Sequence, residues 1–250
     1  MQYWQLRKMF AERSGRYDLV NADWTDNGAD FFINAGQRWL DRMAETGKMI
    51  GKNVQLPASG TVRVAYTGLR AVKEIWAGNS TDGLVKLEKR TLAALKEYYE
   101  EQLGSVDVGQ PLYYAPASFR PIPDTQASAG WSTYYDVDDL ILGDTHYTYN
   151  GVIIAPPTDG TYYISLVGKF YSPDLSATFN ASTEVWTQTK SHWTEVHPDI
   201  LLQAALFKLE VFYRNTEGAK DWKNALDLDM IGLDKDLAEE ELADICEMEG

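Results

Sequence analysis

The hydrophobic pattern of the chain changes its period twice, and this change constrains the fold more than any other feature. Residues 109–190 are rich in Tyr, Thr, Ser, Gly and Pro, with short strand-like runs between turn clusters. On either side, apolar residues recur at three- and four-residue steps, the spacing of a helix with one buried face. The sequence therefore predicts an α+β fold, in which a helical body of N-terminal and C-terminal helices carries a β-rich insertion.

Three regions are expected from this pattern. Residues 1–108 form an N-terminal helical region with short strands, residues 109–195 a β-rich region, and residues 196–250 the C-terminal helices with an acidic tail. The clearest border is His197-Pro198-Asp199, because proline is favoured at the first helical position and an acid stabilises the positive end of a helix. A chain of 250 residues is long enough for one large domain or for a body with an insertion.

Three helices are expected before residue 109. Residues 3–13 have a short amphipathic pattern that ends near Gly15. Asp26-Asn27 can cap a second helix with an apolar face, which closes at Gly47. The hydroxyl of Thr91 can cap a third helix.

The strand signals are strongest in the middle of the chain. Residues 61–77 favour two short strands with a break at Gly68. The best hairpin runs through residues 146–154, because Asn150-Gly151 supplies the positive φ angles of a tight turn. Residues 161–167 suit another strand.

The charge of the chain restricts its partners. The chain has 37 acidic and 23 basic residues, a formal charge of −14, which disfavours binding to nucleic-acid phosphates. DNA could pass such a surface without specific binding, although the same charge is typical of ordinary solubility. A single cysteine, Cys246, and charges among residues 1–13 indicate synthesis in a reducing cytoplasm without a signal peptide. The apolar runs fall short of the roughly 20 residues that cross a bilayer, so no membrane span is expected.

Metal-binding patterns are weak. The histidines His146, His192 and His197 lack the spacing of a metal site, and the first two are expected in the β-rich region. Asp136, Asp138 and Asp139, with nearby Asp144, could hold a divalent ion. They lack the central Gly and final Glu of a calcium loop, so a solvated loop is the favoured interpretation and no metal site is predicted.

Catalytic motifs are missing from the sequence. It contains neither a Gly-x-Ser-x-Gly elbow nor a phosphate-binding glycine loop, so the chain is expected to be no enzyme and to need no cofactor. Tyrosine doublets and tryptophans could instead line a carbohydrate-binding groove. They could equally pack sheets and interfaces, where such residues are enriched. These aromatic residues are Tyr98-Tyr99, Tyr113-Tyr114, Tyr134-Tyr135, Tyr162-Tyr163, Trp131, Trp186 and Trp193.

The C-terminal segment combines charge with an apolar pattern. Gly218 is expected to end one helix, and a second helix begins near Ala219. Residues 227–250 hold ten acids and one base, Lys235, yet apolar residues recur at roughly helical steps. An amphipathic helix that docks on a partner and a frayed surface tail both fit this pattern. The docking residues would be Ile231, Leu233, Leu237, Leu242 and Ile245.

Four segments lie in order along most of the chain: Asp30–Asp41 (DFFINAGQRWLD), Gly109–Tyr114 (GQPLYY), Gly151–Pro157 (GVIIAPP) and His197–Ala205 (HPDILLQAA). Together they resemble segments of the ring-forming head-to-tail adaptor proteins of tailed bacteriophages. The resemblance implies a helical body with a β insertion, a homo-dodecameric ring at the neck of the virion, and C-terminal elements that engage the portal protein. It also implies a downstream tail or nozzle protein as neighbour, a channel for genomic DNA, and subunit packing through Phe31, Trp39 and Trp222. A carbohydrate-binding or other structural module of the tail is the alternative.

Overall fold

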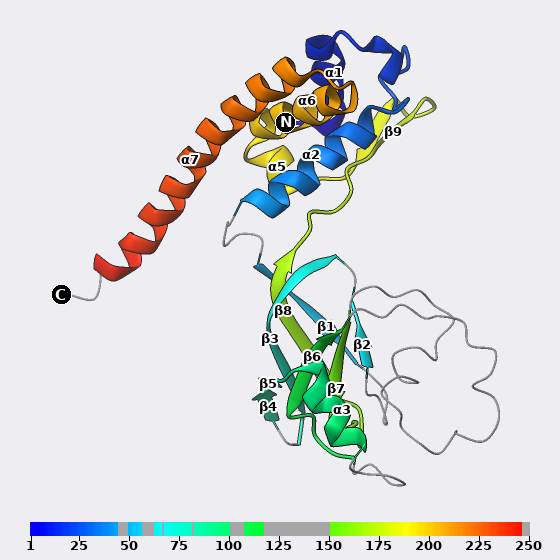
Figure 1. Cartoon of the computed structure of the whole chain (residues 1–250). Helices are drawn as coiled ribbons and strands as arrows, with labels where there is room; N and C mark the ends of the chain where they lie inside the picture. Colours follow the sequence, from blue (N-terminus) through cyan, green and yellow to red (C-terminus); the bar gives the residue numbers. More distant parts are fainter. Residues whose placement is uncertain are drawn as a thin grey trace. The chain divides into compact units, whose positions relative to one another are not determined.

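The chain divides into two compact units in a computed structural model (Figure 1). The helical unit contains residues 1–49 and 171–250, and the β unit contains residues 50–170. This arrangement confirms the predicted α+β class with a β insertion between helical segments. The structure describes residues 1–44, 50–56, 63–66, 68–81, 83–100, 108–117 and 151–246.

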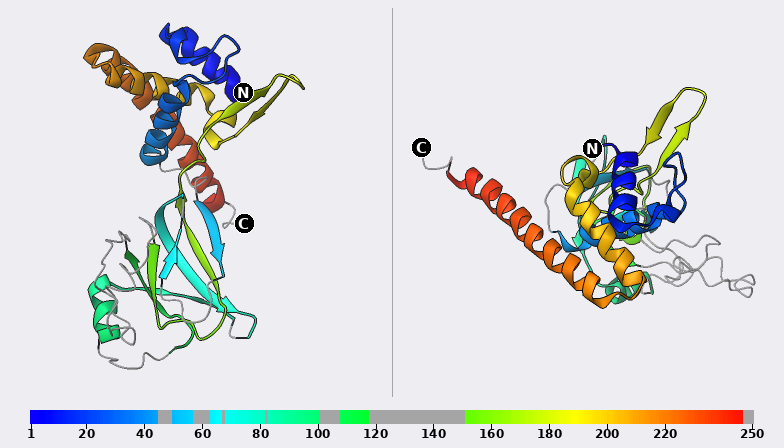
Figure 2. Two further views of the ribbon diagram at one scale, coloured as in Figure 1. Left: turned by 90° about the vertical axis from the view of Figure 1, so that its right-hand side faces the viewer. Right: turned by 90° about the horizontal axis from the view of Figure 1, so that it is seen from above.

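The helical unit combines five helices, a 3-10 turn and one hairpin among the described residues (Figure 2). Helix α6 packs against both α2 and α7, and the hairpin strands β9 and β10 pair antiparallel. The elements are α1 (Tyr3–Ser14), η1 (Tyr17–Leu19), α2 (Ala29–Met43), β9 (Ala177–Asn180), β10 (Val185–Gln188), α5 (His192–Glu195), α6 (Pro198–Phe212) and α7 (Thr216–Cys246).

The contact between α2 and α6 is close because a glycine stands at the crossing. A Cβ atom added at Gly36 would lie 2.7 Å from the backbone nitrogen of Ala205, closer than real Cβ contacts allow. Large side chains fill the space around this crossing: Phe10, Phe32 and Trp193 belong to the same buried cluster. The apolar face predicted for the second helix is therefore the face that builds the core.

Two predicted helix ends are confirmed and one is wrong. Helix α1 stops before Gly15, which has a left-handed φ of 68°, and α6 begins at Pro198. Gly218, in contrast, lies inside the first turn of α7. The break falls earlier because α6 ends at Phe212 and Arg214 takes the left-handed conformation, with a φ of 59°.

The β unit is built from two four-stranded sheets. The first has the order β1-β8-β3-β4 with antiparallel pairs, and the second has the order β2-β7-β6-β5 with a parallel pair between β5 and β6. The elements are β1 (Ile50–Gln55), β2 (Arg63–Ala65), β3 (Leu69–Asn79), β4 (Gly83–Lys86), β5 (Glu88–Lys89), α3 (Leu92–Glu100), β6 (Tyr113–Ala117), β7 (Gly151–Ala155) and β8 (Tyr163–Phe170).

The two sheets share one apolar core. Ile75 and Ile164 from the first sheet and Tyr114 and Ile154 from the second belong to one buried cluster. Helix α3 contacts β6 and β7 and so covers the other face of the second sheet, where Ile153 is buried. The Thr91 hydroxyl accepts a hydrogen bond from the Ala94 amide, as predicted for the start of this helix.

Most predicted strands are present, but the regional borders differ from those expected. Two strands flank Gly68, and β7 and β8 match the predicted runs, whereas residues 146–149 lie outside the described residues. Residue 109 falls inside the β unit, because β2 and β5 pair with strands that follow it. Residue 195 falls inside the helical unit, because β9 and β10 are bound to its helices. His192 likewise lies in α5 rather than in the β region.

Candidate interaction surfaces

A row of polar side chains runs along α2 on the face that meets the returning chain. These residues are separated by four, three and four positions, which places them on one side of a helix. Each makes hydrogen bonds with residues far away in the sequence, in α1 or in the segment from Ser172 to Thr194. We call this row the polar stripe of α2; its members are Asp30, Asn34, Gln37 and Asp41.

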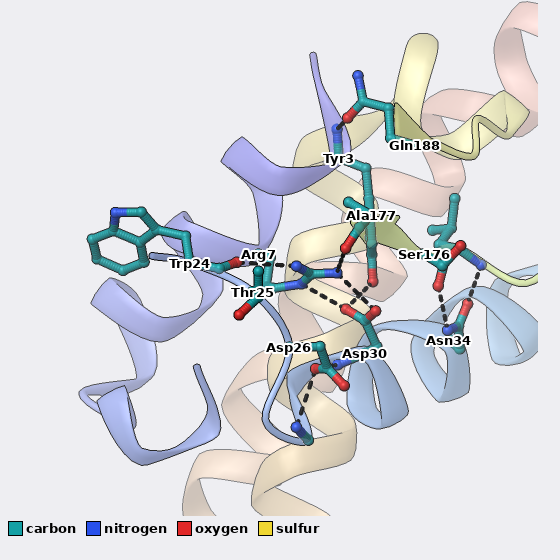
Figure 3. A network of polar contacts seen from close by, with 12 residues as sticks. Tyr3, Arg7, Trp24, Thr25, Asp26, Asp30, Asn34, Ser176, Ala177 and Gln188 are labelled. Carbon is teal, nitrogen blue, oxygen red and sulfur yellow. Dashed lines mark hydrogen bonds and ion pairs between the residues drawn. The ribbon is translucent and has the colours of Figure 1, made fainter. Parts of the chain in front are cut away.

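The first member of the stripe forms a buried ion pair with α1 (Figure 3). The fully buried guanidinium of Arg7 donates from Nε to Oδ1 of Asp30 at 2.7 Å and from Nη2 to Oδ2 at 2.8 Å. Its remaining donors reach the carbonyl oxygens of Trp24 at 3.0 Å and Ala177 at 3.3 Å. Arg7 thereby ties α2, β9 and the segment before α2 to α1.

A tyrosine completes this network. The hydroxyl of Tyr3 donates to Oδ1 of Asp30 at 2.6 Å, and its backbone amide donates to Oε1 of Gln188 at 2.8 Å. Burial, together with the charge of Asp30, raises the pKa of Tyr3, so this hydroxyl keeps its proton and remains a donor. Burial also raises the pKa of Asp30, against the opposing effect of the hydrogen bonds from Arg7 and Tyr3.

The other members of the stripe fix the chain on the far side of α2. Asn34 exchanges two hydrogen bonds with the backbone of Leu175, at 2.9 and 2.7 Å. The Asp41 carboxylate accepts from the Ser172 amide and hydroxyl and from Nε1 of Trp193, at 2.8, 2.9 and 2.7 Å. With its polar groups paired in this way, the stripe is a structural joint of the helical unit rather than a catalytic site.

Exposed aromatic rings gather where the start of α2 meets the end of α6. Phe31 is 67% exposed and lies edge-on to buried Phe32, whose ring centroid is 5.4 Å from that of Phe212. Phe212 contacts Tyr213 at 5.2 Å, and both are exposed. We call the exposed rings of Phe31, Phe212 and Tyr213 the aromatic patch. Such clustered apolar exposure is typical of an interaction surface.

A shallow pocket of about 370 Å³ lies between the start of α6 and the middle of α7. Asp199 and Asp229 contribute carboxylates to it, and Asp229 accepts a hydrogen bond from Gln203 at 2.8 Å. Among its lining residues there is no serine or cysteine nucleophile beside His197. The pocket lining therefore contains no Ser–His or Cys–His pair.

The solvent side of the first sheet carries an unusual set of residues. Directly paired residues of neighbouring strands lie on the same face of a sheet, so the registers of β1, β8, β3 and β4 define this side. Antiparallel sheets with one solvated face normally place polar residues there. This outer sheet face instead combines apolar and basic residues: Ile50, Lys52, Val54, Tyr163, Ser165, Val167, Lys169, Glu74, Trp76, Leu84 and Lys86.

One ordered polar cluster lies within the outer sheet face. Glu74 accepts a hydrogen bond from Nε1 of Trp76 at 3.1 Å and forms an ion pair with Lys86. The hydrogen bond from Lys86 lowers the pKa of Glu74 below its ordinary value. Glu74 is the single acid on this face against three lysines, which is the reverse of the balance of the whole chain.

Two comparisons with known proteins found no match for this chain. No protein-family model and no curated protein matches it. In the described part of the chain, no helix is long and apolar enough to cross a membrane. The same residues contain no group of three or more His, Cys, Asp or Glu that could hold a metal ion. The aspartates Asp136, Asp138, Asp139 and Asp144 lie outside the described residues.

The residues predicted to dock on a partner fall in different environments. Ile231 is 53% exposed on α7, whereas Leu233 is 7% exposed and belongs to the core of the helical unit. Their opposite exposure arises because two helical positions turn the side chain by about 200°. The side chains of Leu237, Leu242 and Ile245 lie outside the described set.

The residues predicted to pack between subunits also differ among themselves. Phe31 is exposed, but Trp39 and Trp222 are half-buried against the core of their own unit. The Trp39 ring lies 5.6 Å from that of Phe207. Of these three residues, Phe31 alone presents most of its surface to solvent.

The aromatic residues considered for sugar binding are largely occupied by packing. Trp193 is fully buried, and Trp186 stacks on Trp4 with centroids 5.6 Å apart. The doublet Tyr162-Tyr163 points to opposite sides, with Tyr162 buried and Tyr163 exposed on the outer sheet face. The side chains of Tyr98-Tyr99, Trp131 and Tyr134-Tyr135 lie outside the described set.

The outer sheet face was not predicted. Strand β1 was not expected, although Ile50, Lys52 and Val54 alternate with smaller and polar residues in the pattern of a strand. That alternation is the signal that could have located it. Its pairing with β8 depends on long-range register, which local patterns do not encode.

Proposed function

We propose that this chain is a non-enzymatic head-to-tail adaptor of a tailed bacteriophage. Copies form a ring in the neck of the virion, between the portal protein and the next tail or nozzle protein, and genomic DNA passes through the ring without specific binding. The observation that carries the proposal is the order of the four adaptor-like segments along the chain. An acidic surface that repels phosphate suits a conduit for DNA.

The C-terminal helix supports the portal-docking part of the proposal. Helix α7 has 31 residues, and Leu226 and Leu233 in its first part belong to the core of the helical unit. The 13 positions after Leu233, at about 1.5 Å each, extend the helix by about 20 Å. Figures 1 and 2 show this part of α7 running past the other helices of its own unit.

Helical spacing indicates which face of α7 would bind the portal protein. Positions 231, 242 and 245 are separated by 11 and 3 residues, which returns them to nearly the same side of a helix. Leu228, which is exposed, precedes Ile231 by three positions on this side. We therefore place the portal-binding face on the side of Leu228, Ile231, Leu242 and Ile245, opposite buried Leu233.

The test is binding of the purified chain to portal rings of the same phage, measured by co-sedimentation. The full chain is expected to bind, and a chain that lacks residues 234–250 is expected to lose binding. Replacement of Leu242 and Ile245 by serine should weaken binding by about tenfold or more, since central apolar anchors dominate interfaces. Replacement of Glu240 and Ala243 by serine is the control, because helical spacing places both positions away from this side of α7.

Two results would contradict the proposal at different levels. Unchanged binding of the truncated chain would overturn docking through α7. Failure of the full chain to bind portal rings, while circular dichroism shows it to be folded, would overturn the adaptor function itself.

A further inference from the structure

The side of α7 that packs against α6 continues into the second half of α7. In the first half, Leu226 and Leu233 belong to the core of the helical unit. Leu233 lines the shallow pocket together with Pro198, the first residue of α6. Helix α7 continues to Cys246, so its last turns run beyond the start of α6 (Figures 1 and 2).

Helical spacing identifies the residues that continue this packed side. Positions 237, 241 and 244 follow Leu233 by 4, 8 and 11 residues, a spacing that returns to one side of a helix. The packed side of α7 thus changes from apolar in its first half to mainly acidic in its second half. We call these three positions the acidic side of α7; its members are Leu237, Glu241 and Asp244.

A lysine without an acidic partner lies between α2 and α6. Nζ of Lys208 is 5.8 Å from the centroid of the Trp39 ring and 5.1 Å from that of Phe207, and the two rings are 5.6 Å apart. Burial and the charge of Arg42 lower the pKa of Lys208, and no carboxylate among the described residues opposes this effect. Met43 is 53% exposed and lies one turn after Trp39 on α2. We call Trp39, Met43, Phe207 and Lys208 the Lys208 patch.

The charge and the apolar surface of the Lys208 patch match an acidic helix that also carries an apolar residue. A carboxylate beside Lys208 would supply the missing counter-charge, and an aliphatic side chain would pack on Met43 and the aromatic rings. The acidic side of α7 has this composition, with two carboxylates and one leucine. Residues 234–250 as a whole hold eight acids and one base, so the attraction extends along the segment.

The two surfaces lie at opposite ends of α6 within one chain. Asp229 of α7 accepts a hydrogen bond from Gln203 at 2.8 Å, so α7 runs back along α6 toward Pro198. Lys208 stands ten positions after Pro198, about 15 Å along α6 in the other direction. The acidic side of α7 therefore points away from the Lys208 patch of its own chain and is placed to meet that of a second copy.

We propose that the acidic side of α7 in one copy binds the Lys208 patch of a second copy. The contact joins two different surfaces, so each chain can bind one neighbour through each, and such contacts form a ring when the rotation between neighbours closes. This inference rests on the proposed function, since it assigns the contact between neighbouring subunits of the adaptor ring. It uses a different side of α7 from the portal-binding face.

The test exchanges the charges of the two surfaces. Lys208→Glu changes the patch, and Glu241→Lys with Asp244→Lys changes the acidic side of α7. Each of these two variants is expected to self-associate about tenfold or more weakly than the original chain in analytical ultracentrifugation at low salt, because like charges then meet. A chain with all three substitutions is expected to recover most of the lost association, because opposite charges meet again.

Matched controls separate this contact from effects of net charge. Lys220→Glu makes the same change of charge at an exposed lysine of the helical unit outside the patch. Asp236→Lys with Glu239→Lys makes the same change as the variant of the acidic side, but on another side of the helix. Both controls should self-associate like the original chain, and circular dichroism should show that all variants are folded. Lys208→Met, which removes the charge and keeps an apolar side chain, replaces Lys208→Glu if that variant does not fold.

The results that would overturn the inference differ from those that would overturn the adaptor function. A folded original chain that stays monomeric at all concentrations, or a folded Lys208 variant that self-associates normally, would reject the contact. A chain with all three substitutions that associates no better than the two separate variants would also reject it. Portal binding by a chain that fails these tests would leave the adaptor function standing. Self-association through these surfaces without portal binding would do the reverse.

Discussion

The polar stripe of α2 and the centre of the outer sheet face differ in how their buried polar groups are paired. In the helical unit, the polar stripe of α2 meets a partner at each position, and the buried Arg7 makes four hydrogen bonds. In the β unit, Ser165 is buried on the outer sheet face without a partner among the described residues. A fully paired polar row contributes hydrogen bonds between distant segments, whereas a buried hydroxyl without a partner lowers the stability of the strand that carries it.

The largest expected effect on stability comes from removing the buried ion pair between Arg7 and Asp30. Arg7→Ala leaves Asp30 without its buried counter-charge and should lower the free energy of unfolding of the helical unit by about 3–5 kcal/mol. Urea titration followed by tryptophan fluorescence measures this, since six of the eight tryptophans lie in that unit. Arg38→Ala, which removes the exposed pair with Asp174, should cost only about 0–1 kcal/mol. Equal losses for both variants would contradict the distinction.

The second prediction concerns the other end of the polar stripe. Asp41→Asn keeps the shape of the side chain but places an amide where a carboxylate accepts three hydrogen bonds from Ser172 and Trp193. The loss should be about 2–3 kcal/mol in the same titration, since donors are left without acceptors in a buried site. The exposed Asp174→Asn is the control and should change stability by less than about 1 kcal/mol. An Asp41→Asn variant as stable as the original chain would show that the hydrogen bonds to Asp41 do not stabilise the helical unit.

The third prediction tests how closely the helices of this unit meet. Gly36→Ala inserts a methyl group against the backbone of Ala205 and should destabilise the unit by about 1–3 kcal/mol. Gly232→Ala, in α7, meets no atom within 4 Å and should be neutral or stabilising by up to about 1 kcal/mol, because alanine favours a helix. Thermal unfolding of the two variants side by side checks the difference. If both substitutions changed the stability in the same direction, the contact between α2 and α6 would be able to adjust to the added methyl group.

The smallest expected effect lies in the β unit. Ser165→Ala removes an unpaired buried hydroxyl and should stabilise the isolated chain by about 1 kcal/mol, seen as slower hydrogen exchange in β3 and β8. Ser182→Ala, in an exposed turn, should alter neither property. A destabilised isolated Ser165→Ala chain would show that the hydroxyl already has a partner.

Much of the fold could be predicted because its signals are local. The helix stop at Gly15, the proline that starts α6 and the strands around Gly68 depend on the conformational limits of single residues. The borders of the two units could not be predicted, since they depend on which strands pair across residue 109. The helix break before α7 was predicted at Gly218. It falls earlier, because Arg214 and not Gly218 takes the left-handed conformation.

The candidate surfaces were predictable only in part. The exposure of Phe31 agrees with a role at the surface, but Trp39 and Trp222 are half-buried against the core of their unit and Leu233 belongs to that core. Helical spacing alone cannot distinguish a docking face from a core face. The outer sheet face was not predicted, although two of its strands were. Its members come from four strands that the register brings together.

The sequence by itself determined the class of fold, the place of the helices and the acidic charge, since these follow from residue types and their local spacing. Only the tertiary structure decided that the polar residues of α2 form a closed joint and that Ser165 lies unpaired between Val54 and Trp76. The physical reason is that hydrogen-bond partners and sheet neighbours are chosen by contacts between residues far apart in the chain. The type of a residue determines which hydrogen bonds it can form, and the fold determines which residues lie close enough to form them.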